Sequence, residues 1–334
     1  MSMLAAILYQ IVQMLLVLAL APLLTGWVRL VKARLLGRRG PSLLQPYRDL
    51  SRLLRKEVVL AHNASWLFRS VPYMMFTAIW LAAGLVPVFT TQLALAPTAD
   101  LIALIALLGS ARFFLALAGM DVGTAFGGIG SSREMMIAAF AEPAMLMMVF
   151  SVAILVRSTS LAEIADFMMS GTVGLRVSLA LALIALVMVA VAENARIPID
   201  NPATHLELTM VHEAMVLEYS GRHLALVEAA SMLKLLLYVA LIACVFVPWG
   251  LATGSHGSVP GGLVSFVAKM AVAGAALALF ETSVAKMRVF RVGEFLGGAL
   301  LLSLLGAIFL YVSRGCEWWT SAMTPRISWA RWCC

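Results

Sequence analysis

The residues of this sequence that are best suited to chemistry lie in one stretch, Ala192–Gly221, between two long apolar segments. The stretch carries five carboxylates and two histidines: Glu193, Asp200, His205, Glu207, His212, Glu213 and Glu218. Closely spaced carboxylates raise one another's pKa, and histidine titrates near neutral pH, so both residue types can exchange protons under physiological conditions. The pattern favours a site that moves protons or binds a partner. The alternative is a set of solvated charges on a surface helix.

The stretch does not predict a metal or catalytic centre. On a helix, His205 and His212 would share a face but lie about 10 Å apart, which is too far for one metal ion. The four cysteines lack the C-x-x-C spacings of zinc or iron–sulfur sites. The sequence therefore predicts no metal site and no catalytic residue in this chain, and any redox cofactor would lie in a partner chain.

Three further ionisable residues fall inside apolar segments, where an unpaired charge costs several kcal/mol. Arg112, Glu142 and Lys234 each lie about eight or nine residues from the expected end of their segment, which is about 12–14 Å along a helix. We expect Glu142 to pair with Arg112 or Lys234, and Glu228 to extend the acidic route toward the surface. A proton path and a static structural ion pair are both consistent with this pattern.

The elements that must position these residues are membrane-spanning helices. Hydrophobic residues make up 62% of the 334-residue chain, and the mean hydropathy is +0.97, outside the range of soluble domains. Several runs exceed the roughly 18–20 apolar residues that cross a bilayer. We predict an all-α polytopic membrane protein with about eight spans, at residues 5–28, 71–92, 99–120, 134–156, 175–193, 225–249, 262–284 and 293–312. Residues 1–312 would form the membrane domain, and residues 313–334 a tail that contains tryptophan and cysteine.

The first loop between spans, residues 29–70, is rich in basic residues. Because such loops face the cytoplasm, both termini are expected on the outer, periplasmic side of a cytoplasmic membrane. Apolar residues recur at helical spacing within the loop: Tyr47, Leu50, Leu53, Leu54 and Val58. They predict an amphipathic, horizontal helix on the cytoplasmic side, lying along the membrane surface or against a partner. The net charge of +7 reflects this orientation rule and does not indicate nucleic-acid binding.

Several motifs resemble a known family. Residues 193–202 read E-N-x-R-x-P-x-D-x-P, followed by E-L at residues 207–208 and E-Y-S-G at residues 218–221. Together with R-R-G-P-x-x-L-Q-P-Y-R-D at residues 38–49, this pattern resembles the subunit 1 family of respiratory complex I. Blocks at residues 111–126, 129–134 and 141–143 resemble the corresponding membrane subunit of energy-converting nickel–iron hydrogenases, the hydrogenase-4 and formate hydrogenlyase group.

This resemblance implies a non-catalytic membrane subunit that anchors a soluble redox arm and couples electron transfer to proton or sodium movement. Its partners would be the hydrogenase large and small (iron–sulfur) subunits, antiporter-like membrane subunits and the lipid bilayer. The nickel–iron centre and the iron–sulfur clusters would lie in partner subunits. Carried over by position, the coupling path would include Glu142, Glu193, Asp200, Glu207 and Glu218, and the docking residues would be Arg38, Arg39, Asp49 and Arg196.

The sequence departs from complex I in ways that favour the hydrogenase branch. His205 stands where complex I has a glutamate, and the interval between Leu208 and Glu218 is longer, with His212 and Glu213 inside it. A quinone is therefore not favoured as a ligand. Two alternatives remain: the corresponding membrane subunit of an NADH:quinone oxidoreductase, contributing to a quinone site, and a stand-alone ion carrier.

Overall fold

The computed structural model describes residues 3–170, 177–196, 211–252, 258–284 and 292–323, with side chains as far as residue 313. This part of the chain contains helices and no β-strand. The elements are α1 (Met3–Leu35), α2 (Gln45–Leu54), α3 (Trp66–Leu85), the 3₁₀ helix η1 (Ala96–Thr98), α4 (Leu101–Asp121), α5 (Ala125–Val156), α6 (Leu161–Met169), α7 (Val177–Glu193), α9 (His212–Val216), α10 (Gly221–Phe246), α11 (Val259–Ser283) and α12 (Val292–Met323).

The long helices account for the predicted membrane spans. Among the described residues, six helices are long and apolar enough to cross a bilayer: α1, α4, α5, α10, α11 and α12. Two more predicted spans coincide with α3, which carries Arg69 near its start, and with α7, which is 17 residues long. The predicted class, an all-α polytopic membrane protein, is confirmed. The number of eight spans remains a prediction.

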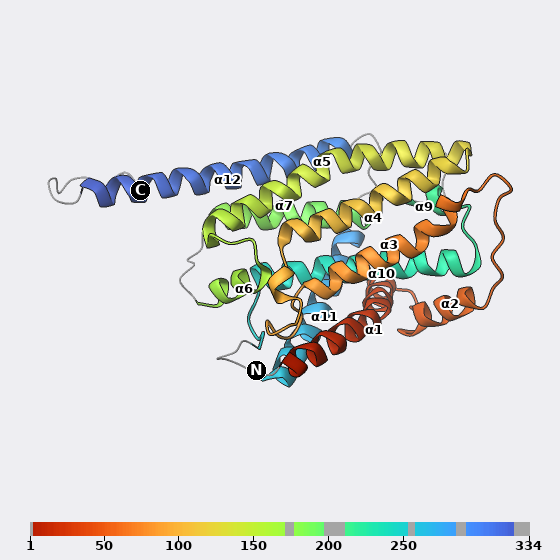
Figure 1. Ribbon diagram of the computed structural model, residues 1–334, viewed down its shortest axis with the longest axis horizontal. Coiled ribbons are helices and arrows are strands. Elements are labelled where there is room, and N and C mark those ends of the chain that lie inside the picture. Colours follow the sequence, from red (N-terminus) through yellow and green to blue (C-terminus); the bar gives the residue numbers. More distant parts are fainter. Residues whose placement is uncertain (1–2, 171–176, 197–210, 253–257, 285–291, 324–334) are drawn as a thin grey trace.

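The long helices run side by side, and α10 lies at the centre of the bundle (Figure 1). It packs against α1, α2, α3, α6, α7 and α11. At one edge α12 packs along α5 and α7. The helices α2 and α9 both lie at one end of the bundle, on opposite sides of it, and α6 lies at the other end (Figure 1). Most of α10 is buried, as expected of a helix that is apolar on all faces.

The glycine-rich segment after α4 is mostly helical. Gly123, at φ 71°, makes the turn, and the Thr124 hydroxyl caps the new helix by accepting from Gly127 N at 3.2 Å. A side chain at Gly127 would clash with the backbone oxygen of Gly119, so this pair lets α4 and α5 cross closely. As a result α5 begins at Ala125, nine residues before the expected start of that span.

The amphipathic pattern in the first loop forms a helix at the expected place. The helix α2 covers Gln45–Leu54 and packs against α1 and α10. It ends before Val58, the last residue of the predicted pattern. Tyr47 anchors the helix, since its hydroxyl donates to the backbone oxygen of Ala19 in α1. The membrane-surface position of α2 stays a prediction.

Candidate functional site

The candidate site begins where α7 ends, at Glu193. Ala195 N donates to Ala192 O at 3.1 Å, and Arg196 N donates to Val191 O at 3.0 Å. These are the paired bonds of a Schellman motif, which requires a residue in the left-handed conformation. Ala195 supplies it, at φ 49°. The E-N-x-R motif therefore terminates the helix, and the side chains of Glu193 and Arg196 take part in different ion-pair groups.

The side chain of Glu193 is fully buried and is held by two cations from other helices. Arg112 of α4 forms an ion pair with one carboxylate oxygen through Nη2, and Lys234 Nζ of α10 lies 2.8 Å from the other oxygen. Lys234 Nζ also donates to the backbone oxygen of Glu193 at 2.9 Å, satisfying a carbonyl that the helix end leaves unpaired. A buried carboxylate at the negative end of a helix dipole is unfavourable, so the two cations are required to stabilise it.

Arg112 is shared with two carboxylates of α5. Its Nε lies 3.6 Å from Glu134 Oε1, and its Nη1 lies 3.8 Å from Glu142 Oε1. The Glu134 side chain is 10% exposed, whereas that of Glu142 is 43% exposed. We call these five residues the central cluster: Arg112, Glu134, Glu142, Glu193 and Lys234. With every group ionised it holds three negative and two positive charges, so one added proton would make it neutral.

The central cluster lies inside the bundle rather than at its end. Arg112 pairs with Glu193, the last residue of α7, and lies nine residues before the end of α4. The end of α7 is therefore about 14 Å short of the level at which α4 ends. The polar stretch that starts at Glu193 therefore begins among packed helices. Glu142 and Lys234 lie further along their helices than expected, because α5 and α10 begin nine and four residues earlier, but the ion pairs still bring Arg112, Glu142 and Lys234 into one cluster.

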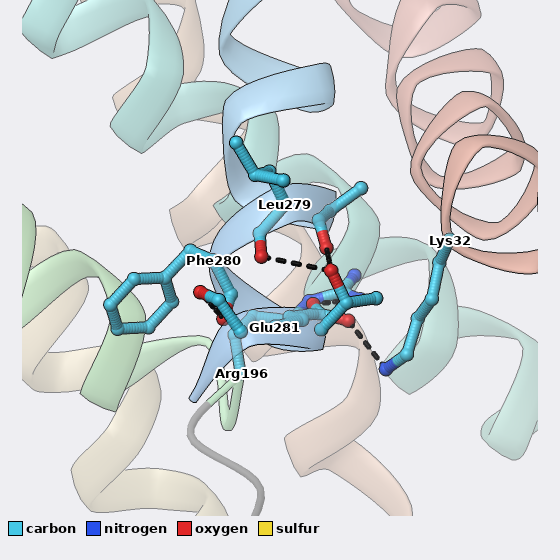
Figure 2. Close-up of polar contacts among 8 residues, drawn as sticks. Lys32, Arg196, Leu279, Phe280 and Glu281 are labelled. Carbon is cyan, nitrogen blue, oxygen red and sulfur yellow. Dashed lines mark hydrogen bonds and ion pairs between the residues drawn. The ribbon is translucent and has the colours of Figure 1, made fainter. Parts of the chain in front are cut away.

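A second ion-pair group joins the residues after α7 to α1 and α11 (Figure 2). Glu281 Oε2 lies 2.7 Å from Lys32 Nζ, and Glu281 Oε1 lies 3.4 Å from Arg196 Nη1. The Glu281 side chain is only 6% exposed. Burial lowers the pKa of Arg196, an effect that the Glu281 carboxylate opposes and the nearby Arg29 guanidinium increases. Arginine side chains stay protonated in proteins, so Glu281 faces a cation on each side.

Two adjoining cavities border the central cluster and Arg196 of the second group. The first, of about 240 Å³, is lined by Arg112, Glu134, Glu193 and Lys234 of the central cluster. The second, of about 410 Å³, extends to Glu228. Five residues line both cavities: Arg29, Arg196, His212, Glu213 and Ser231. Each cavity is large enough for several water molecules and has the polar walls that buried water needs.

The structure brings together five of the residues predicted for the proton route. Glu142 and Glu193 belong to the central cluster, and His212, Glu213 and Glu228 line the cavities.

The other predicted route residues fall elsewhere. Glu218 is half-buried in the turn after α9. Asp200, His205 and Glu207 lie outside the described residues. A helix was expected over residues 203–219, and the described part of that range contains only the five-residue helix α9.

The residues predicted for docking show two kinds of environment. Arg38 and Arg39 are exposed between α1 and α2. Asp49 accepts a hydrogen bond from Gln45 Nε2 at 3.0 Å within α2. Arg196 is engaged by Glu281 within the chain, and its docking role stays a prediction.

Sequence reasoning gave no ion-pair partner for three residues of these groups, Glu134, Lys32 and Glu281. Glu134 was expected at the membrane surface, because it is the first residue of the predicted span 134–156. Glu281 carried a usable signal, since a carboxylate near the end of an apolar segment requires a cation. Among the described residues, no group of three His, Cys, Asp or Glu side chains is placed to hold a metal ion.

The fold and the buried charges define a polytopic membrane protein with an ionisable centre inside its helix bundle. A family model described as NADH dehydrogenase matches residues 8–312, and the chain belongs to this family of complex I subunit 1-like proteins. The predicted family is thereby confirmed.

Named relatives come from both branches of the family. The chain is 35% identical to formate hydrogenlyase subunit 4 of Escherichia coli over 285 residues, which cover 85% of this chain and 92% of that protein. It is 33% identical to hydrogenase-4 component C of the same organism, covering 74% of this chain and 77% of that protein. Identity to a subunit of the NADH-quinone oxidoreductase of Phocaeicola vulgatus is 25%, over 63% of this chain and 59% of that protein.

A solved structure shares the fold. The chain superposes with a TM-score of 0.76 on a chain of the membrane-bound sulfane sulfur reductase, an archaeal respiratory membrane complex. The match covers 91% of this chain and 98% of that one, at 19% identity. This likeness supports the helix arrangement alone.

Proposed function

We propose that this chain is the membrane subunit of a formate hydrogenlyase or hydrogenase-4-type complex, in which it anchors the soluble redox arm and couples electron transfer to proton or sodium movement. The observation that carries the proposal is the 35% identity to formate hydrogenlyase subunit 4 across 92% of that protein. The chain is a non-catalytic subunit in this proposal, and the nickel–iron and iron–sulfur chemistry belongs to the partner hydrogenase subunits.

The central cluster supports the coupling role. Its three carboxylates outnumber its two cations, so a proton carried by one acid would leave the cluster neutral. Glu142 is the most exposed of the three acids, so it is the group that we assign to exchange with the surroundings. The adjoining cavities would carry protons past His212, Glu213 and Glu228 toward the end of the bundle where α2 and α9 lie.

The positive charge of the segment between α1 and α3 supports docking of the soluble redox arm at this end of the bundle. Arg38 and Arg39 are exposed between α1 and α2, and α2 lies at the same end of the bundle as α9 (Figure 1). We assign this end to the cytoplasm and to the docked hydrogenase subunits, with both chain termini on the periplasmic side. Antiporter-like membrane subunits would then contact the side of the bundle, and the charge movement in this chain would be coupled to them.

The test is the composition and activity of the complex purified through this chain. Hydrogenase large and small subunits should co-purify, and the preparation should evolve hydrogen from a reduced donor. Quinone reduction that is sensitive to inhibitors, without hydrogen evolution, would instead identify an NADH:quinone oxidoreductase subunit. Ion transport by the isolated chain in vesicles, without a redox partner, would identify a stand-alone carrier. Either result would refute the proposal.

A further inference from the structure

An apolar cavity of about 380 Å³ opens between α1, α2, α3 and α10. Its walls include Leu15, Pro22, Leu50 and Phe76, and no charged side chain of the described residues lines it. The lining extends over residues 225–233 of α10, which is about 12 Å along that helix. The cavity is therefore a hydrocarbon-lined space that extends along a membrane-spanning helix.

The helix α2 forms one wall of this cavity and also lines a basic groove of about 660 Å³. Four exposed cations line the groove: Arg48, Arg52, Arg55 and Lys56. Within the part of the chain that the structure describes, no carboxylate lies within ion-pairing distance of these four side chains. Tyr47 lines both spaces, so the apolar cavity and the basic groove meet at this residue.

The position of α2 is set by close contacts with α1. The Tyr47 hydroxyl donates to Ala19 O, and the backbone oxygen of Leu43, just before α2, packs against Gly26 where a Cβ would clash. Leu54, beside the basic side chains, is 53% exposed. The protein thus holds apolar and cationic groups together on a fixed helix.

We propose that the cavity and the groove together bind one anionic phospholipid, with an acyl chain in the cavity and the phosphate against the α2 arginines. Guanidinium groups bind phosphate oxygens through charge-assisted, often bidentate hydrogen bonds. Clusters of four or more basic residues on amphipathic helices bind anionic lipids. A lipid matches both spaces, whereas an acidic protein surface would match only the groove. The site is separate from the coupling role, since none of its residues belongs to the central cluster.

The test is lipid retention by the purified complex, measured by native mass spectrometry after delipidation and incubation with phosphatidylglycerol or phosphatidylcholine. The unmodified complex should retain phosphatidylglycerol in preference to phosphatidylcholine. Arg48→Gln combined with Arg52→Gln should weaken phosphatidylglycerol binding about 25-fold, because each basic side chain at an anionic lipid surface contributes a factor of about five. Arg69→Gln is the matched control, since Arg69 is an exposed arginine of α3 that lines neither space.

A second variant tests the apolar half of the site. Ala229 lines the cavity, and Ala229→Phe should fill it and reduce retention of phosphatidylglycerol. Equal retention of both lipids, or unchanged phosphatidylglycerol binding in the arginine variant, would overturn the proposal. Displacement of the lipid by millimolar inorganic phosphate would assign the groove to free phosphate instead. Loss of soluble subunits from the arginine variant, with lipid retention unchanged, would assign it to an acidic partner surface.

Discussion

Replacement of Lys234 by methionine tests how much the Lys234 ammonium group, which pairs with Glu193 at the end of α7, contributes to stability. The Lys234 ammonium lies 2.8 Å from the Glu193 carboxylate and 2.9 Å from the Glu193 backbone oxygen, and methionine removes both contacts while it keeps an apolar stem. Removing one partner of a buried ion pair costs about 3–5 kcal/mol, and an unsatisfied buried carbonyl costs about 1–3 kcal/mol. The expected loss of roughly 4–8 kcal/mol is comparable with the stability of a whole domain.

Two further variants isolate the cause of this loss. Lys234→Met combined with Glu193→Gln also removes the Glu193 charge, which Arg112 alone would otherwise balance, so the double variant should be more stable than Lys234→Met alone. Lys269→Met is the matched control. Lys269 Nζ of α11 donates to the backbone oxygen of Val247 at the end of α10, at 2.5 Å. Among the described residues it has no carboxylate partner, so its loss should cost only about 1–3 kcal/mol.

The assay is the midpoint of heat-induced loss of the folded complex, followed by size-exclusion chromatography of purified samples. The entropy of unfolding is about 2.1 cal/mol/K per residue, so one kcal/mol shifts the midpoint of a 334-residue chain by about 1.4 °C, and Lys234→Met should lower the midpoint by roughly 6–11 °C. The drop should be at least twice that of Lys269→Met. Equal drops in the two lysine variants, or a double variant less stable than Lys234→Met, would refute the ion-pair reasoning.

Three other predictions concern coupling, docking and the helix end. Glu142→Gln should abolish coupled ion movement while soluble subunits stay attached, since it removes the half-exposed acid of the central cluster; unchanged proton uptake in vesicles would contradict this role. Arg39→Ala should release soluble subunits into the wash of isolated membranes, whereas Arg69→Ala should not, because only the first lies in the proposed docking loop. Ala195→Gly should raise the free energy of unfolding by about 1 kcal/mol, because glycine adopts φ 49° without the steric cost that alanine carries. A lower heat-denaturation midpoint in this variant would contradict the prediction.

The sequence by itself determined the class of protein and its family. Long apolar segments can satisfy their backbone groups in hydrocarbon only as helices, so composition and segment length were sufficient to predict an all-α membrane protein. The amphipathic spacing around Tyr47 and Leu50 also predicted a helix, which is α2. The E-N-x-R motif and its companion blocks identified the family that the comparisons confirm.

Only the tertiary structure decided which charges meet. The sequence offered Arg112 or Lys234 as the partner of Glu142, and it did not show that Arg112 and Lys234 both hold Glu193. It also placed Glu134 at the first residue of a span, whereas α5 begins nine residues earlier. An ion pair between helices depends on which helices pack together and at what level each begins, and an apolar helix has no periodic pattern that records either.

The interpretation of the stretch Ala192–Gly221 changed for the same reason. From the sequence, it was a polar loop at a membrane face. In the structure, α7 stops inside the bundle, and the stretch begins with a buried carboxylate between two cations. Local residues set the point where the helix ends, because Ala195 and Arg196 close the Schellman motif. The depth of that point is set by the longer helices α4 and α10, which continue past it and supply the charges that make burial of Glu193 possible.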